Sequence, residues 1–310
     1  MLSRVAESIY WIGRYTERAE NTARLVNLNM NLLLDMPKHA RPSWGNMVTM
    51  TGSEAAFKKR YKEDDERSVV RFLLIDAKNP SSMLNSLAMA RENARTVRDI
   101  IPQSGWEHLN GLYRAAREGS KTGLNRKNRF AYLISVIRDI EALSGVLSST
   151  MLHDSGYSFL RMGRMLERAD MTSRIIDELS AGTVDSDPLG EAENSLRWMG
   201  LLKTLNAYHM YRREMEVAVE RDPVLDFLLC CPTYPRSVMH CLNELAAELR
   251  KLPRFKAALG TCSDAHTLLN ETDHTDLNQQ GLHQHMDAIQ LALVAINNEI
   301  SRTYFQLSDD

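Results

Sequence analysis

Charged side chains recur with one spacing in two parts of the chain. The pattern is G-R-x-x-E-R-A-[ED]-x-T-x-R, and its copies begin at Gly13 and, 150 residues later, at Gly163. It supplies the candidate site residues Arg14, Glu17, Arg18, Glu20, Arg24, Arg164, Glu167, Arg168, Asp170 and Arg174. Guanidinium groups bind carboxylates and phosphates through paired hydrogen bonds, and carboxylates bind amines, metals or guanidiniums. These residue types indicate ion pairing or the binding of a charged ligand.

The spacing places these charges on one face of a helix. With about 3.6 residues per turn, positions 13, 17, 20 and 24 fall on one stripe beside an apolar stripe. The charges return in the second copy, whereas Tyr15 and Asn21 are replaced there by Met165 and Met171. A charge taken out of water costs several kcal/mol unless it is paired. The recurrence therefore indicates a partly buried ion-pair network.

Three interpretations of the repeated charges are open. In the first, the copies pair across an interface and fix its register, through Glu17, Arg18, Arg24 and Glu167, Arg168, Arg174. In the second, the arginines bind a carboxylate or phosphate, and the glutamates hold an amine, a metal or those arginines. In the third, the face is solvated. The glycine that begins each copy would allow another helix or backbone to approach closely.

A further arginine face occurs in the first half of the chain. Arg91, Arg95 and Arg98 lie at helical spacing, with Glu92 and Asn93 between them, whereas the matching positions of the second half are Ala246, Arg250 and Pro253. Like charges along a helix repel unless an anion or an acidic partner meets them. We expect these arginines to pair with acids on a neighbouring helix; the alternative is an anion site that the second half lacks.

The sequence predicts no metal, no cofactor and no self-sufficient catalytic site. The four cysteines, Cys230, Cys231, Cys241 and Cys262, lack C-x-x-C spacing. Histidines and an aspartate near the end could gather around a cation, but their spacing does not repeat: His240, Asp264, His266, His274, His283 and His285. A glycine-rich phosphate loop, a G-x-S-x-G elbow and an H-E-x-x-H motif are all missing from the sequence.

Helices must position these charges. The 9 prolines leave long segments free of helix breakers, and apolar residues recur in steps of three and four, which predicts an all-α helical bundle. We expect helices over 3–35, 129–153, 155–180, 190–220, 235–252 and 282–306. We also expect a helix that begins with Asn79 as N-cap and Pro80 as first residue. Loops are expected over 36–43, the basic segment 120–128, 182–193 and 271–281.

Similarity between the halves extends beyond the charged motif. Trp44 matches Trp198, and residues such as Pro80 and Ser82 match Pro235 and Ser237 at a shift of 155. Matches in the same order with nearly constant offset predict a tandem duplication with repeats 1–153 and 154–310. Because the possible linkers are short, we expect one continuous helical body, a single domain over 1–310.

Composition bounds the class of protein. Of 310 residues, 44% are hydrophobic and 25% charged, and 38 Lys+Arg against 40 Asp+Glu give a net charge of −2. This balance argues against a nucleic-acid or anionic-membrane binder. The sequence lacks an apolar run of membrane-spanning length, and Arg4 and Glu7 interrupt any signal-like start. Four cysteines do not make a disulfide scaffold, so we expect a cytoplasmic protein.

Four motifs resemble the bacterial Alpha-E family of helical proteins; they lie at 8–24, 90–95, 159–170 and 235–242. The resemblance spans essentially the whole chain. It implies genes encoded beside circularly permuted ATP-grasp ligases and transglutaminase-like proteins, sometimes with a proteasome-like peptidase. It therefore implies a part in ATP-dependent amide-bond formation. The family has no established catalytic residues that could be transferred to this chain.

Two functional hypotheses follow. The first is a non-catalytic accessory or scaffolding component that binds the ATP-grasp ligase, its peptide product or an amino-acid-like anion. The lack of a phosphate-binding motif favours it, because the partner would then handle ATP. The second is an enzyme that uses Glu17 with Glu20, or Glu167 with Asp170, for acid–base chemistry. A purely structural protein is a third hypothesis.

Overall fold

The protein is all helical. The computed structural model describes residues 1–35, 43–181, 188–216, 218–274 and 276–306. These residues form helices and no strand, which confirms the predicted fold class. The helices are α1 (Ser3–Asp35), α2 (Trp44–Met50), α3 (Glu54–Lys58), α4 (Glu66–Leu74), α5 (Met83–Thr96), α6 (Gln103–Leu124), α7 (Arg126–Thr150), α8 (Ser155–Ser180), α9 (Pro188–Thr204), α10 (Tyr208–Glu214), α11 (Arg221–Cys230), α12 (Val238–Leu249), α13 (Lys256–Asn270) and α14 (Gln279–Tyr304).

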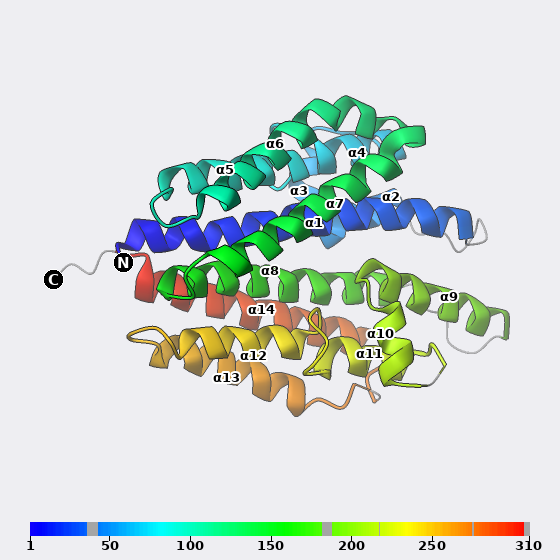
Figure 1. The fold of residues 1–310 in the computed structure, drawn as a ribbon. Coiled ribbons are helices and arrows are strands. Elements are labelled where there is room, and N and C mark those ends of the chain that lie inside the picture. The colour runs from blue at the N-terminus through cyan, green and yellow to red at the C-terminus, as the bar shows by residue number, and fades with distance from the viewer. Residues whose placement is uncertain (36–42, 182–187, 217, 275, 307–310) are drawn as a thin grey trace.

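Two long central helices carry the arrangement. In Figure 1, α1 and α8 lie side by side and run in the same direction. Helices α5 and α7 pack on α1, and α6 packs on both of them; in the same way α12 and α14 pack on α8, and α13 packs on both of them. One cluster of buried apolar side chains draws on helices of both groups. The common ancestry of the two halves stays a prediction.

The central helices touch backbone to backbone at the two motif glycines. A β-carbon on Gly13 would lie 2.2 Å from the carbonyl oxygen of Leu160, and one on Gly163 would lie 2.1 Å from that of Tyr10. Any other residue at either position would force the helices apart, because a Cβ contact at this distance is a steric clash. The expected close approach is confirmed, and it places the charges that follow each glycine opposite one another.

The start of α5 differs from the prediction. This helix begins at Met83 with Ser82 as its N-cap, not at Pro80. The side chain of Asn79 instead donates to the carbonyl oxygen of Phe72 and accepts from the amide of Ser81, so it closes the turn after α4. An asparagine can cap a helix or stabilise a turn, and the tertiary contact with α4 selects the turn.

The predicted basic loop over 120–128 is wrong. Helix α6 continues to Leu124, α7 begins at Arg126, and Asn125 alone separates them. The buried Arg129 explains the short connection, because its guanidinium donates to the last carbonyls of α6, at Gly123 and Leu124. These are carbonyls that the end of a helix leaves without partners.

The remaining helix and loop ranges agree with the structure in part. Helices α1, α8 and α14 lie close to the expected ranges, and the expected loop over 271–281 separates α13 from α14. The expected helix over 190–220 is broken after α9, where Asn206 has a φ of 57°. Of the other two expected loops, 36–42 and 182–187 lie outside the described residues, while 188–193 is helical. Helices α2, α3, α4, α6, α11 and α13 lie outside the predicted ranges.

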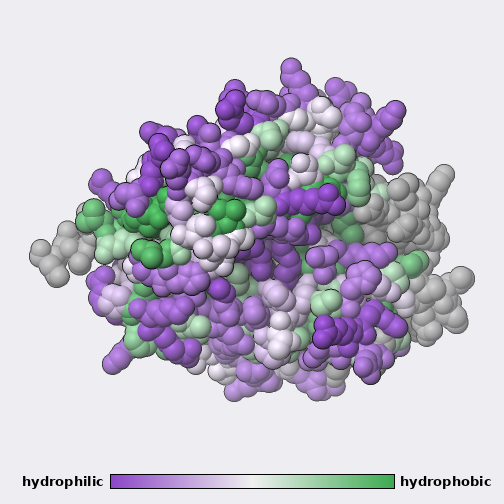
Figure 2. All heavy atoms as spheres, viewed as in Figure 1, coloured by the Kyte–Doolittle hydropathy of each residue, from purple (hydrophilic) through white to green (hydrophobic). Residues whose placement is uncertain are grey.

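The surface is mainly hydrophilic on the face drawn in Figure 2, with apolar side chains gathered toward the end at which α1 begins. Two of the most exposed apolar side chains lie at the starts of α1 and α8, where Leu2 is 77% and Leu152 is 79% exposed. Within the described residues, each helix is too short or too polar to cross a lipid bilayer.

Candidate functional site

The two repeated motifs meet where α1 and α8 cross. The Glu17 carboxylate accepts hydrogen bonds from Nε and Nη2 of Arg168, each at 2.8 Å, and from Nε of Arg164 at 3.1 Å. The Glu167 carboxylate accepts from Nε of Arg14 at 2.5 Å and from Nε and Nη2 of Arg18 at 2.6 and 3.0 Å. Each glutamate is thus paired with two arginines of the other motif, as the interface interpretation expects.

The last arginine of each motif does not cross the interface, contrary to that interpretation. Arg24 pairs at 2.8 Å with Glu20 one turn earlier on α1, and it also reaches Glu141 on α7. Arg174 pairs at 3.1 Å with Asp170 one turn earlier on α8. Residues four apart on a helix are neighbours, so these arginines find an acid without leaving their own helix.

The crossed glutamates are buried and ionised. Glu17 is 1% and Glu167 is 3% exposed. Burial by itself would raise the pKa of both carboxyl groups, but the arginines outweigh it. Arg168, Arg236 and Arg164 hold the pKa of Glu17 well below its usual range, and Arg14 and Arg18 lower the pKa of Glu167. A general acid or base works best with a pKa near the operating pH, so the pairing disfavours that role for both glutamates.

A residue outside the repeated motif completes the contacts of Glu17. Arg236 lies in the turn before α12, and its Nη1 donates to Glu17 at 3.1 Å and to Asn21 at 3.0 Å, while its Nη2 donates to Glu20. We call Glu17 and its partners the Glu17 cluster: Glu17, Glu20, Arg24, Arg164, Arg168 and Arg236. Arg236 was not among the predicted site residues, although it lies in one of the four motifs of the family resemblance.

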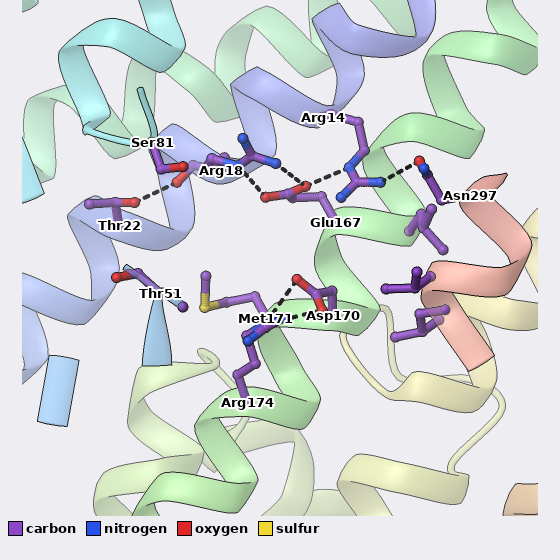
Figure 3. Close-up of a pocket in the computed structure, with 14 residues that line it drawn as sticks. Arg14, Arg18, Thr22, Thr51, Ser81, Glu167, Asp170, Met171, Arg174 and Asn297 are labelled. Carbon is purple, nitrogen blue, oxygen red and sulfur yellow. Dashed lines mark hydrogen bonds and ion pairs between the residues drawn. The ribbon is translucent and has the colours of Figure 1, made fainter. Parts of the chain in front are cut away.

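The corresponding Glu167 cluster consists of Glu167, Asp170, Arg14, Arg18 and Arg174. It borders a pocket of about 290 Å³ between α1, α8 and α14 (Figure 3). The wall also includes Thr51 and Gly52 after α2, Ser81 before α5 and Asn297 on α14. Arg14 is positioned by Asn297, whose side-chain oxygen accepts from its Nη1 at 3.0 Å. We call this space the Glu167 pocket and take it as the candidate functional site.

The Glu17 cluster has a different relation to the nearest cavity. That cavity has a volume of about 230 Å³ and is lined by Arg164, Arg168 and Pro235 among other residues. Of the described residues, Glu17 and Glu20 are not among those that line it. Arg236 covers them, with 9% of its own side chain exposed.

Within the described part of the chain, the other predicted arginine face does not pair with acids of a neighbouring helix. Arg91 and Arg98 lie over the ring of Trp106 on α6, at 5.7 and 5.0 Å from its centroid, and Arg95 pairs with the exposed Glu92 on its own helix. Cation–π contacts therefore replace the expected acids of a neighbouring helix. The backbone carbonyl of Asn93, another predicted site residue, accepts from the hydroxyl of Thr96. Residues 91–98 are not among those that line the pocket beside Glu167.

Possible metal ligands lie elsewhere. Among the described residues, one trio brings its ligand atoms within 4.8 Å of one another: Asp177, His283 and Asp287 on α8 and α14. His283 and Asp287 are exposed, and the trio is not part of the repeated motifs. Of the cysteines, Cys230 lies 3.3 Å from Nε2 of His274, and burial raises the pKa of its thiol to about 11.

The fold and the crossed pairs define an all-helical protein whose two central helices are joined by buried glutamate–arginine contacts. A family model described as an alpha-helical domain with a conserved ER motif matches residues 1–305, so the chain belongs to the Alpha-E family. The Glu-Arg dipeptides at 17–18 and 167–168 supply the crossed contacts and agree with that description.

The curated relatives are longer than this chain. Uncharacterised proteins of Mycobacterium bovis and of two strains of Mycobacterium tuberculosis are each 25% identical to it over 268 residues. The matched region is 81% of this chain but 30% of each relative. The chain thus resembles one part of a larger polypeptide. No solved structure matches it.

Proposed function

We propose that this protein is a non-catalytic binding component of an ATP-grasp-dependent system that makes or modifies amide bonds in the cytoplasm. The observation that carries the proposal is the Glu167 pocket. Its carboxylates and guanidiniums are already paired with one another, and the helix crossing holds them rigidly. A preorganised charged pocket binds a ligand at a low entropic cost.

The partners in this proposal are a circularly permuted ATP-grasp ligase and a transglutaminase-like protein, as the family resemblance implies. The relatives support an association with other domains, because the matched region is 30% of their length and so belongs to a longer chain there. In this proposal the ligase binds ATP and forms the bond, while the helical protein holds the peptide or positions the ligase.

The alternative is an enzyme that acts through Glu17 with Glu20 or Glu167 with Asp170. The lowered pKa of Glu17 and of Glu167 argues against proton transfer by these groups near neutral pH. Turnover of ATP and amino acids by this chain alone would favour the enzyme and contradict the binding component.

Co-purification tests the proposed partnership. The chain carries an affinity tag and is co-expressed with a circularly permuted ATP-grasp ligase from the same organism; a helical protein of similar size serves as the control bait. We expect the ligase to elute with the tagged chain at micromolar concentration and not with the control. Clean separation of the two proteins under these conditions would contradict the partnership.

A further inference from the structure

The Glu17 and Glu167 clusters differ by one guanidinium group. The Glu17 cluster has four arginines around Glu17 and Glu20, with Glu141 as a further acid beside Arg24, and the Glu167 cluster has three arginines around two acids. The extra group belongs to Arg236, which bridges Glu17 and Glu20 while it is almost fully buried. The molecule itself therefore shows that a guanidinium is accommodated between two such carboxylates, even with other arginines nearby.

Ser81 stands where the second cluster would need that arginine. Ser81 and Arg236 directly precede the N-cap serines of α5 and α12, Ser82 and Ser237. Arg236 reaches across to the acids of α1, whereas Ser81 lines the pocket that contains the acids of α8. Because the serine side chain ends after one oxygen, the space that Arg236 fills on one side remains open on the other.

Both acids of the pocket project from one face of α8, one turn apart. In Figure 3, Glu167 lies with Arg14 and Arg18, and Asp170 lies with Arg174 on the next turn of the same helix. The two acids are thus related to each other as Glu17 and Glu20 are on α1, where Arg236 bridges them. Met171 occupies the position that corresponds to Asn21, and it provides an apolar surface against which a methylene chain can pack.

We propose that the Glu167 pocket binds a guanidinium group carried on a flexible stem, as in an arginine side chain, between Glu167 and Asp170. The inference rests on the proposed role as a binding component and names its ligand class. The bound guanidinium takes the place between Glu167 and Asp170 that Arg236 takes between Glu17 and Glu20. A volume of about 290 Å³ suits a ligand of amino-acid size, since pockets for larger molecules start near 300 Å³.

The comparison with the Glu17 cluster favours a cation over an anion. The Nε groups of Arg14 and Arg18 donate to Glu167, and Nη1 of Arg14 donates to Asn297 and to the hydroxyl of Tyr10. The Nε of Arg174 donates to Asp170. An anion would meet the two carboxylates on this face of α8, whereas a guanidinium would meet an acid pair of the kind that Arg236 bridges on α1.

Calorimetric titration of the full chain tests the ligand class. The probe is N-acetyl-arginine methylamide, and the control is the citrulline analogue, which has nearly the same shape but no charge. We expect the arginine probe to bind at least about tenfold more tightly, because each charged hydrogen bond to a carboxylate is lost in the analogue. Equal affinity for the two, no binding of the arginine probe at millimolar concentration, or tighter binding of inorganic phosphate would overturn the proposal.

Two substitutions of Ser81 test where the guanidinium group binds. Ser81→Arg supplies the missing side chain from the chain itself, so we expect it to weaken probe binding at least about tenfold while the protein stays folded. Ser81→Ala is the matched control and should leave the affinity within about twofold. Undiminished binding to Ser81→Arg contradicts the proposal. That variant removes no ion pair, so folding is not at risk from an uncompensated charge.

Asp170 is tested separately. Asp170→Asn should weaken binding of the arginine probe about tenfold, whereas Asp264→Asn, at an exposed site on α13, should have no effect. Unchanged affinity in Asp170→Asn would show that the guanidinium does not lie between the two acids. If this variant fails to fold, Ser81→Arg still decides the question.

Two comparisons complete the test. Free arginine against the capped probe identifies the source of the group: tighter binding of the capped form indicates an arginine within a peptide or protein, and tighter binding of free arginine indicates a metabolite. Either result supports the pocket. Failure of co-purification with intact probe binding would remove the ATP-grasp partnership and leave the pocket standing, whereas co-purification without probe binding would do the reverse.

Discussion

The Glu17 and Glu167 clusters use one local motif for two different ends. In both, a buried glutamate accepts from two arginines of the opposite central helix. In the first, Arg236 adds a third guanidinium and closes the cluster; in the second, Ser81 leaves a pocket. The residue that separates structural packing from a candidate site therefore lies outside the motif, in a turn that the motif does not include.

The comparison also orders the energetic importance of the two acids. A buried ion pair contributes little net stability, but removal of one partner leaves the other charge buried and uncompensated. Glu17 compensates three guanidiniums, and those of Arg168 and Arg236 have 8% and 9% of their side chains exposed. Glu167 compensates Arg14 and Arg18, whose side chains are 12% and 20% exposed. Loss of Glu17 should therefore be the more damaging change.

The largest expected effect is that of Glu17→Gln. We expect this variant to lower the free energy of unfolding by about 3–5 kcal/mol, because three arginines lose their common acid. Glu167→Gln should cost less, since water in the pocket can solvate Arg14 and Arg18. Urea unfolding followed by circular dichroism measures both. A greater loss for Glu167→Gln would reverse the comparison between the clusters.

Next in size is the effect of a methyl group at the helix crossing. Gly13→Ala and Gly163→Ala should each destabilise the protein by about 1–3 kcal/mol or more, since the new Cβ meets a carbonyl of the opposite helix. Gly111→Ala on α6 is the control: its Cβ would meet nothing within 4 Å, so alanine should stabilise the helix by about 0.5–1 kcal/mol. Tolerance of both crossing substitutions would mean that the central helices are further apart than described.

Sequence reasoning predicted the central part of this site well. Helices α1 and α8 are long and have a regular apolar period, so their ranges and the shared face of their charges could be read directly. The glycine at the start of each motif indicated a close approach, and the recurrence of Glu17 and Glu167 indicated burial. Both features depend on local spacing within a helix.

Other parts depend on contacts that spacing does not encode. Arg236 reaches Glu17 from a turn more than 200 residues away, and a single arginine in a turn carries no periodic signal. Its counterpart Ser81 is recognised as a pocket residue only when the turn before α5 is compared with the turn before α12 in the structure. Arg91 and Arg98 contact the aromatic face of Trp106 in place of acids, and the spacing of arginines on one helix does not indicate an aromatic partner on the next.

The pH dependence of the free energy of unfolding tests the ionisation of Glu17 and Glu167 without a substitution. Arginines hold the pKa of Glu17 and of Glu167 below the usual range, so the unfolded chain binds more protons as the pH falls through the ordinary glutamate pKa of about 4.3. The contribution of these two carboxylates to the free energy of unfolding should be constant above about pH 4.3 and should decrease below it. Each carboxyl contributes a slope of at most about 1.4 kcal/mol per pH unit.

The same measurement on Glu167→Gln isolates one of the two contributions. Unfolding curves between pH 3 and pH 7 should show a shallower loss below about pH 4.3 than in the unmodified protein. His274 and His285 also have lowered pKa values because of burial, with His285 at about 4, and they reduce stability below their ordinary pKa in both proteins. Their contribution cancels in the difference between the two curves. Identical slopes would mean that Glu167 titrates normally in the folded state.

The smallest expected effect belongs to the arginine face that lies outside the clusters. Arg95 pairs with Glu92 in solvent, where both side chains are about half exposed: 57% and 49%. Exposed pairs of this kind are screened by water and salt and add little to stability. Arg95→Ala should therefore leave the urea midpoint unchanged within error and leave probe binding at the Glu167 pocket unaffected. A clear loss of binding would mean that this arginine face belongs to the ligand site. Burial of a glutamate–arginine pair would then not distinguish the ligand site from the rest of the surface.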